Sequence, residues 1–103
     1  MNTILTITGS DSTGGSGLQA DIRTITELGG IATSAVTCIT IQNTLGIQEF
    51  HDIPASVVEA QIEAIVNDVE PSTVKIGMIR NAAILSVVVT ALRKYNPHHV
   101  VYD

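Results

Sequence analysis

A glycine-rich stretch near the amino terminus, Thr8–Asp21, constrains this chain more than any other feature. It reads TGSDSTGGSGLQAD and holds four of the chain's eight glycines, between a short apolar run and a helical pattern that starts at about Leu18. Glycine allows the positive φ angles and the close backbone approach that a tight binding loop needs. The amides at the start of the next helix point into the same space. The stretch therefore predicts a ligand-binding loop between a strand and a helix.

The residues of this loop disfavour a standard phosphate-binding motif. It has neither the G-K-[ST] of a Walker A loop nor the G-x-G-x-x-G spacing of a dinucleotide site. It has no lysine or arginine, and it does contain Asp11 and Asp21. We therefore expect a neutral or weakly basic polar ligand, with Asp21 accepting hydrogen bonds from it. The alternative is that the glycines only shape a turn and that Asp21 is a solvated residue of the first helical turn.

The composition fits one folded domain and excludes several classes of protein. Of 103 residues, 45% are hydrophobic and 15% are charged, and a net charge of −5 leaves no basic surface for a nucleic acid. No apolar run reaches the roughly 18 residues that cross a membrane, and the first residues lack a basic signal-peptide region. The single cysteine, Cys38, fits a reducing cytoplasm, and its apolar surroundings indicate a buried thiol. We therefore expect a cytoplasmic protein with no nucleic-acid or membrane partner.

The apolar pattern predicts alternating strands and helices. Strands are expected at residues 3–8, 32–41, 73–76 and 99–102. Helices are expected at residues 18–28, 54–68 and 81–95, the last with Asn81 or the residue before it as its N-cap. Residues 44–53 are expected to form a turn and a short, partly exposed strand or flap. This order indicates an α/β fold in three layers, with a mainly parallel sheet between flanking helices.

Polar residues or glycines follow each predicted strand of the sheet. They are Gly9, Gln42-Asn43, Gly77-Met78 and Asp103. Ligands of open parallel sheets bind beyond the carboxyl ends of the strands, so these residues should share one rim. The amide of Gln42 has one acceptor and two donors in a plane, which matches the edge of an aminopyrimidine, and Met78 would supply an apolar wall for a ring face. The alternatives are a local turn contact for Gln42 and core packing for Met78.

Lys75 lies inside the predicted strand that ends at Gly77. Two roles are open for its ammonium group. We expect either a structural ion pair or a contact with the ligand.

Four motifs together resemble a known family. They are ITGSDSTGGSGLQAD, TIQNT, VKIGMI and the terminal VVYD. In order and spacing they are similar to the amino-terminal part of the hydroxymethylpyrimidine/phosphomethylpyrimidine kinases, thiamine-pathway enzymes of the ribokinase-like superfamily. Thr8, Ser16 and Ile41 stand where that family often has alanine, and none of these departures removes a polar contact.

The resemblance implies a ribokinase-like fold in which residues 1–103 are the amino-terminal, substrate-binding part of a kinase domain. The implied kinase phosphorylates 4-amino-5-hydroxymethyl-2-methylpyrimidine and its monophosphate with ATP. Its implied substrate-binding residues are Gly9, Asp21, Thr40, Gln42 and Met78. Gln42 would bond the pyrimidine edge, Asp21 and the Gly9 backbone would hold polar groups of the ring, and the other two would line the pocket.

The resemblance also implies ATP and Mg²⁺ as cofactors, with Asp103 near the magnesium and phosphate region. Chains of the family are more than twice as long, and their ATP-binding half and catalytic base lie beyond residue 103. We therefore expect no kinase activity from these residues alone, with neither a catalytic residue nor a complete metal site among them. The open edge of the fourth strand predicts a homo-oligomer or marginal stability.

Two other functions stay open at this point. A pyridoxal-type kinase of the same superfamily would use a similar cavity for a different ring. A non-catalytic small-molecule-binding module would use the cavity without chemistry. The ring that binds at Gln42 distinguishes the two kinases, and the coding sequence after Asp103 distinguishes a kinase from a binding module.

Overall fold

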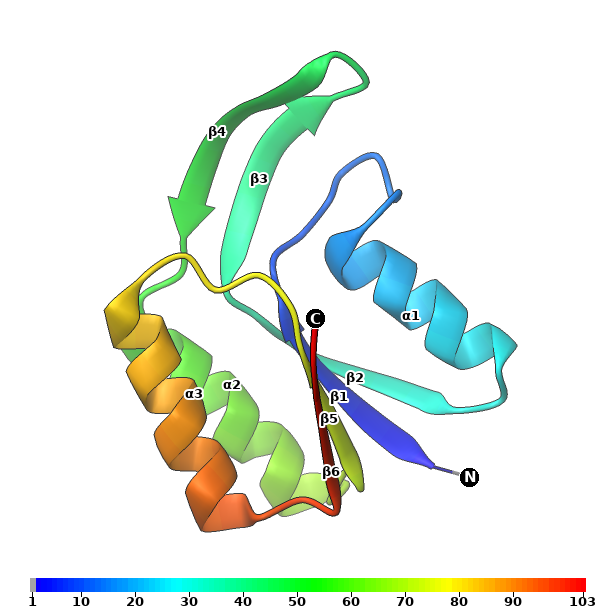
Figure 1. The fold of residues 1–103 in the computed structure, drawn as a ribbon, viewed down its shortest axis with the longest axis vertical. Coiled ribbons are helices and arrows are strands. Elements are labelled where there is room, and N and C mark those ends of the chain that lie inside the picture. Colours follow the sequence, from blue (N-terminus) through cyan, green and yellow to red (C-terminus); the bar gives the residue numbers. More distant parts are fainter. Residues whose placement is uncertain (1) are drawn as a thin grey trace.

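The computed structural model describes residues 2–103, and in this part of the chain a sheet lies between helices (Figure 1). The elements are β1 (Thr3–Thr8), α1 (Gly17–Glu27), β2 (Ile31–Val36), β3 (Cys38–Asn43), β4 (Gly46–Asp52), α2 (Ala55–Asp68), β5 (Thr73–Ile76), α3 (Ala82–Tyr95) and β6 (His99–Tyr102). None of the helices within residues 2–103 is long and apolar enough to cross a membrane.

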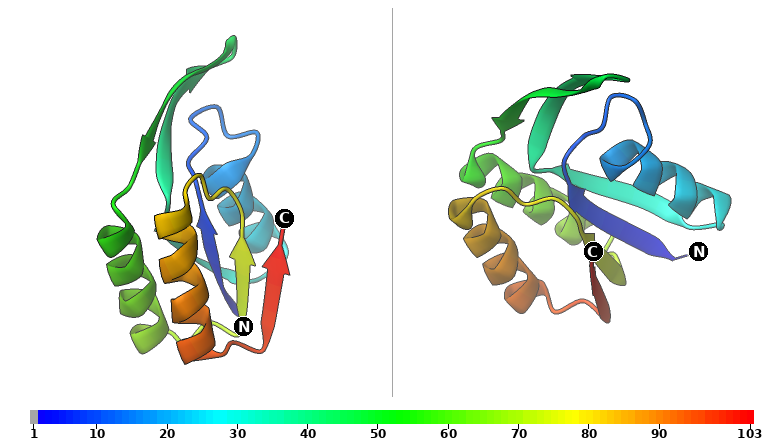
Figure 2. Two further views of the ribbon diagram at one scale, coloured as in Figure 1. Left: turned by 60° about the vertical axis from the view of Figure 1, so that its left-hand side comes forward. Right: turned by 45° about the horizontal axis from the view of Figure 1, so that its top comes forward.

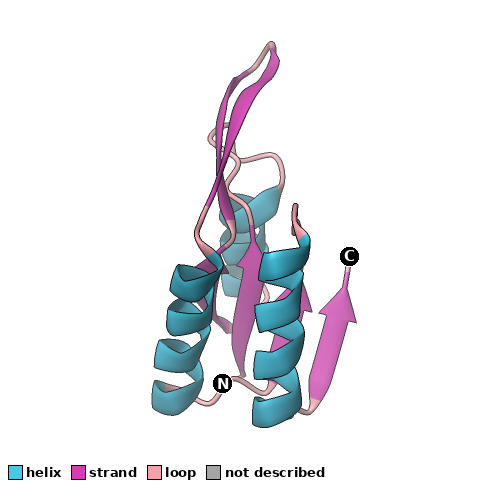
Figure 3. Ribbon diagram, turned by 90° about the vertical axis from the view of Figure 1, so that its left-hand side faces the viewer, coloured by secondary structure: helices cyan, strands magenta, loops and turns pink. Residues whose placement is uncertain are grey.

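Four strands form one parallel sheet in the order β2-β1-β5-β6. In this register Ile7 of β1 lies between Ala35 of β2 and Ile76 of β5. Helices α2 and α3 lie side by side on one face of the sheet, and α1 lies on the other (Figures 2 and 3). The predicted three-layer α/β fold is therefore confirmed.

The hydrophobic core lies between the sheet and the pair α2 and α3. Its buried residues are Leu5, Ile7, Ala35, Val58, Ile62, Val74, Ile76, Ile84 and Val88. Each large aliphatic side chain buried in this way stabilises the fold by about 1.5–3 kcal/mol relative to exposure. Helix α1 contributes no buried residue, so we expect polar contacts to hold it against the sheet.

The helix ends follow the sequence closely. The side chain of Asn81 accepts a hydrogen bond from the Ile84 amide at 2.9 Å, which confirms the predicted N-cap of α3. Arg93 and Lys94 lie in the last turn of that helix, where cations interact favourably with its dipole. These local signals fix where α3 begins and ends.

The single strand predicted for residues 32–41 is wrong, because the chain leaves the sheet at Thr37. The Thr37 amide donates to the Thr8 carbonyl, its hydroxyl donates to the Met78 carbonyl, and its own carbonyl accepts from the Ile53 amide. The chain then continues as β3, which pairs antiparallel with β4 in a hairpin that rises above the sheet (Figure 1). The predicted flap at residues 44–53 is confirmed as the second strand of this hairpin.

Candidate ligand-binding site

A cavity of about 220 Å³ lies beyond the carboxyl ends of β1 and β5, with residues of the β3–β4 hairpin in its wall. The glycine-rich loop, both strand ends and the hairpin all contribute to its lining. Five of the predicted site residues meet there, namely Gly9, Thr40, Gln42, Met78 and Asp103. The strand-end rule therefore locates the cavity, although Gln42 reaches it from the hairpin and not from the end of a sheet strand.

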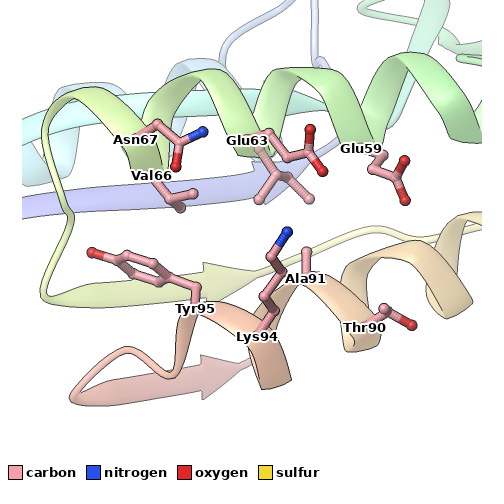
Figure 4. Close-up of a pocket in the computed structure, with 9 residues that line it drawn as sticks. Glu59, Glu63, Val66, Asn67, Thr90, Ala91, Lys94 and Tyr95 are labelled. Carbon is pink, nitrogen blue, oxygen red and sulfur yellow. The ribbon is translucent and has the colours of Figure 1, made fainter.

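A larger cavity of about 440 Å³ lies between α2 and α3 (Figure 4). Glu59 and Glu63 of α2 lie across this gap from Lys94 of α3. The gap lies on the helical layer, outside the rim where parallel sheets present strand ends and loop amides to a ligand. The smaller cavity is therefore the better candidate, despite its size.

Asp11 organises the glycine-rich loop beside this cavity. Its Oδ1 accepts hydrogen bonds from the Thr13 amide at 3.0 Å and the Thr13 hydroxyl at 2.8 Å. Its Oδ2 accepts from the Ser16 amide at 2.8 Å and the Ser16 hydroxyl at 2.9 Å. These bonds, those of Thr13 first, lower the pKa of Asp11 from 3.8 to about 2 against the opposing effect of burial. The side chain is thus an ionised acceptor at neutral pH.

The loop is tied to the hairpin by backbone and side-chain bonds. The Ser10 amide donates to the Cys38 carbonyl at 2.9 Å, and the Thr40 amide donates to the Ser10 hydroxyl at 3.1 Å. The Ser12 hydroxyl donates to the Gln42 carbonyl at 3.2 Å. These bonds hold β3 above the loop and bring the Gln42 side chain to the cavity wall.

Gly17 is the position where the loop most requires glycine. Its φ is +61°, and a Cβ there would lie 2.6 Å from the carbonyl oxygen of Gly9. The same oxygen accepts a hydrogen bond from the Leu18 amide at 2.9 Å, in the first turn of α1. The start of α1 is thereby packed directly against the end of β1.

Asp21 does not line this cavity. Its Oδ2 accepts from the Thr6 hydroxyl at 2.6 Å, and the Lys75 ammonium donates to Oδ1 at 2.7 Å and to Oδ2 at 2.9 Å. The two charged side chains are 14% and 23% exposed. The first turn of α1 contains no acidic residue, so the alternative of a first-turn solvated aspartate is wrong. The ion pair expected as one interpretation of Lys75 is formed.

Asp21 lines a neighbouring cavity of about 390 Å³ between α1 and the strands β5 and β6. Lys75 and Asp103 line both cavities, so the two spaces meet at these residues. A ligand in the first cavity would have to extend into the neighbouring one to contact Asp21. The predicted contact between Asp21 and the ligand stays a prediction.

Asp103 is the one predicted residue of a magnesium and phosphate region. Its side chain is 80% exposed, and its Oδ2 lies 3.8 Å from the Lys75 Nζ. Within residues 2–103 there is no group of three or more His, Cys, Asp or Glu side chains that could hold a metal ion. The predicted place of Asp103 in a magnesium and phosphate region stays a prediction.

Cys38 and Met78 lie beside the residue that follows β1, Gly9. Cys38 is buried, and burial, with Asp52 as a smaller cause, raises the pKa of its thiol. The predicted buried thiol is thus confirmed. Met78 is 39% exposed and lines the cavity, with its sulfur 3.9 Å from the Cys38 sulfur. This position supports the predicted role of Met78 as an apolar wall of the cavity more than a role in core packing.

Sequence reasoning missed what Asp11 does. A local signal exists, because an Asp in a loop commonly accepts a hydrogen bond from the backbone two residues on, in an Asx turn. Sequence reasoning left the partner of Lys75 open, and no local signal gives it, since Asp21 lies 54 residues away. That pair depends on packing α1 against the sheet.

Comparison with known proteins decides the family. The profile of the family described as phosphomethylpyrimidine kinase matches residues 11–103 of this chain. The chain belongs to the phosphomethylpyrimidine kinase family. A hydroxymethylpyrimidine/phosphomethylpyrimidine kinase of Mycobacterium leprae is 52% identical over 85 residues, which are 82% of this chain and 30% of the relative. The chain spans about a third of the length of the curated kinases it matches.

Solved structures agree with this assignment. A phosphomethylpyrimidine kinase from Clostridium difficile 630 superposes with a TM-score of 0.96 at 43% identity, covering 100% of this chain and 45% of the other. A Bacillus subtilis pyridoxal kinase, solved as an ADP complex, superposes with a TM-score of 0.93 at 29% identity, covering 100% of this chain and 39% of the other. The predicted ribokinase-like fold is thus confirmed, and this chain corresponds to part of it.

Proposed function

We propose that this chain is the pyrimidine-binding part of a kinase that phosphorylates 4-amino-5-hydroxymethyl-2-methylpyrimidine and its monophosphate with ATP. The observation that carries the proposal is the Gln42 side chain, which lines a cavity beyond the strand ends together with the glycine-rich loop. A planar amide offers a donor and an acceptor to the edge of an aminopyrimidine. Membership of the phosphomethylpyrimidine kinase family supports the reaction class.

The size and charge of the cavity fit a small neutral ring. Its volume of about 220 Å³ is below the roughly 300–1,000 Å³ of pockets for drug-sized ligands, which suits a single ring. Lys75, the cation that lines the cavity, is paired with Asp21. It is therefore not free to bind an anionic ligand, which favours a neutral one. Met78 offers an apolar surface for one ring face.

Asp21 and Asp103 have proposed roles beside the ring. Asp21 would hold a polar substituent that extends toward the neighbouring cavity, and the backbone of Gly9 would hold another. Asp103, at the junction of the two cavities, would lie near the phosphate and magnesium region. Phosphoryl transfer needs positioning and charge stabilisation around the moving group. One exposed carboxylate beside a paired lysine supplies little of either, so we expect binding without turnover from these 103 residues.

Calorimetric titration tests the proposal with three ligands: 4-amino-5-hydroxymethyl-2-methylpyrimidine, pyridoxal and ATP with Mg²⁺. We expect saturable binding of the pyrimidine at one site, weaker binding of pyridoxal, and no phosphorylated product when all are mixed. Gln42→Ala should weaken pyrimidine binding about tenfold, the effect of one good hydrogen-bonding group. The matched control is Gln48→Ala, on the exposed part of the same hairpin, which should bind normally.

Three results would contradict the proposal in different ways. Absence of pyrimidine binding would remove the assigned ligand. Tighter binding of pyridoxal would favour a pyridoxal-type kinase, the second candidate, which the superposition on the Bacillus subtilis pyridoxal kinase supports. Phosphorylated product would show that these residues suffice for catalysis.

A further inference from the structure

The side-chain amide of Gln42 contacts a carboxylate, which can only accept hydrogen bonds, and a hydroxyl, which can donate or accept them. Its Nε2 lies 2.5 Å from Oδ1 of Asp11, and its Oε1 contacts the hydroxyl of Thr40. An ionised carboxylate has no hydrogen to donate, so only the NH₂ side of the amide can face it. Turning the amide by 180° would press two oxygen atoms together. The contact with Asp11 therefore selects one of the two amide orientations.

Asp11 is itself held rigidly. Oδ1 already accepts two bonds from Thr13, and Oδ2 accepts two from Ser16, so the carboxylate is fixed in direction before Gln42 reaches it. The residue is only 6% exposed, which limits competition from water. The low pKa of Asp11 keeps it an acceptor over the neutral range. These features allow the Asp11 carboxylate to hold the Gln42 amide in one orientation.

The hydroxyl of Thr40 has one hydrogen and two acceptors within reach. One is the Ser10 carbonyl oxygen at 2.9 Å, and the other is Oε1 of Gln42. With Oε1 turned toward it, the hydroxyl can donate to that oxygen. The orientation set at Asp11 thus extends along the chain of contacts from Asp11 through Gln42 to Thr40.

We propose that Asp11 is a positioning residue that fixes the amide of Gln42 in one orientation and so determines which ring edge the cavity accepts. After its contacts with Asp11 and Thr40, the amide has one N–H and one lone pair left for a ligand. That pair fits a ring nitrogen beside an amino group. It opposes the reversed edge, a ring N–H beside a carbonyl group. The inference rests on the proposed function, since it assumes that a pyrimidine edge meets Gln42.

The test compares 4-amino-5-hydroxymethyl-2-methylpyrimidine with its 4-oxo analogue, which reverses donor and acceptor on the same ring. The wild-type chain should bind the amino compound at least about tenfold more tightly, because the analogue mismatches both hydrogen bonds of the edge. In Asp11→Asn the new amide can donate as well as accept, so Gln42 can turn and this preference should fall to about two- to threefold. The control is Asp68→Asn, the same change at the exposed end of α2, which should keep the wild-type ratio.

Hydrogen exchange of the Gln42 side-chain NH₂, followed by ¹⁵N NMR without ligand, is the second measurement. One of its two hydrogens should be protected in the wild type and unprotected in Asp11→Asn. Unchanged protection, or an unchanged ratio of affinities, would overturn the proposal. If the wild type binds neither ring, the proposed function fails and the specificity role with it, whereas exchange still shows whether Asp11 holds the amide.

A variant on the other side of the contact covers the case in which Asp11→Asn does not fold. Gln42→Glu opposes two carboxylates and should lower the melting temperature more than Gln48→Glu, which adds the same charge on the exposed part of the hairpin. Adding Asp11→Asn to Gln42→Glu should restore most of the loss, because the asparagine can donate to the new carboxylate. Equal melting temperatures for both glutamate variants would contradict the proposed contact.

Discussion

At the scale of single residues, Asp11 couples the shape of the glycine-rich loop to pH. Its carboxylate accepts four hydrogen bonds within the loop and lies against the amide of Gln42. Each of these bonds favours the ionised form, so the folded state resists protonation more strongly than the unfolded chain does. Acid should therefore act on this loop through one identifiable group.

The pKa of Asp11 gives the direction and the range of this pH dependence. It falls from 3.8 to about 2 on folding, so between these values the unfolded chain binds more protons than the folded one. The contribution of Asp11 to the free energy of unfolding should be complete above about pH 4 and should be lost as the pH falls toward 2. Urea unfolding of the wild type and Asp11→Asn from pH 2 to 6 measures it. A difference between the two proteins that stays constant below pH 4 would contradict this account.

A comparison of Gly17 with Gly29 separates the cost of backbone strain from the cost of a steric clash. Gly17→Ala would place a Cβ at positive φ and 2.6 Å from the Gly9 carbonyl oxygen, whereas Gly29 also has positive φ, +87°, but nothing within 4 Å of such a Cβ. Gly29→Ala should therefore cost about 1 kcal/mol of unfolding free energy, from strain alone. Gly17→Ala should cost at least about 2 kcal/mol more, because backbone must move. Chemical denaturation measures both, and equal losses would mean that the loop relaxes freely.

Most of the candidate site was predictable because it depends on one general rule about strand ends. Gly9, Met78 and Asp103 follow strands of the parallel sheet and do line the cavity. The pairing of Asp21 with Lys75 was only one of two possibilities, because it depends on how α1 packs against β5. Local sequence carries no information about a contact of that kind.

At the scale of elements, the start of the β3–β4 hairpin is the strand boundary that the residue pattern did not predict. Ile39 and Ile41 are about half exposed on its outer side, whereas Cys38 and Thr40 are buried on its inner side. The run from β2 into β3 is rich in β-branched residues and has no glycine or proline to interrupt it, so it was predicted as one strand of the sheet. The break at Thr37 depends on bonds to Thr8 and to the Met78 carbonyl, which lies 41 residues along the chain. The helices, in contrast, were predictable from periodicity and end signals.

Helix α1 should depend on the ion pair below it, because it has no buried residue of its own. Lys75→Met removes the cation and leaves Asp21 with the Thr6 hydroxyl alone. For a pair that is partly exposed, we expect a loss of about 2 kcal/mol, between the values for surface and buried pairs. Amide hydrogen exchange should rise more in α1 than in α2.

Lys94→Met is the control for this change. Lys94 is exposed in the last turn of α3, so its replacement should alter stability by about 0.5 kcal/mol or less. Chemical denaturation of the two variants gives the comparison. If Lys75→Met is as stable as Lys94→Met, the ion pair does not hold α1 to the sheet.

At the scale of the whole molecule, the two faces of the sheet are covered unequally. Helix α1 packs on β1 and β2 (Figure 2). The same face of β5 and β6 borders the cavity of about 390 Å³. All four residues of the edge strand β6 are exposed, including Val101 at 50% and Tyr102 at 72%. An apolar edge strand with unpaired backbone groups is a template for pairing with another chain.

This edge should make the chain self-associate. Sedimentation over a range of micromolar concentrations should show a mass that rises with concentration, and Tyr102→Lys should shift the distribution toward monomer, since an edge lysine opposes pairing. Leu45→Lys, at the 94% exposed tip of the hairpin, is the control and should leave association unchanged. A monomer at every concentration would contradict the prediction, and loss of association only in Leu45→Lys would move the interface to the hairpin.

The proposed function depends on where a pyrimidine ring binds, and a crystal structure of the chain with 4-amino-5-hydroxymethyl-2-methylpyrimidine measures this directly. We expect the ring in the cavity beyond β1 and β5, with one face against Met78 and its nitrogen and amino group on the amide of Gln42. A ring bound between α2 and α3, or bound without contact to Gln42, would contradict the account.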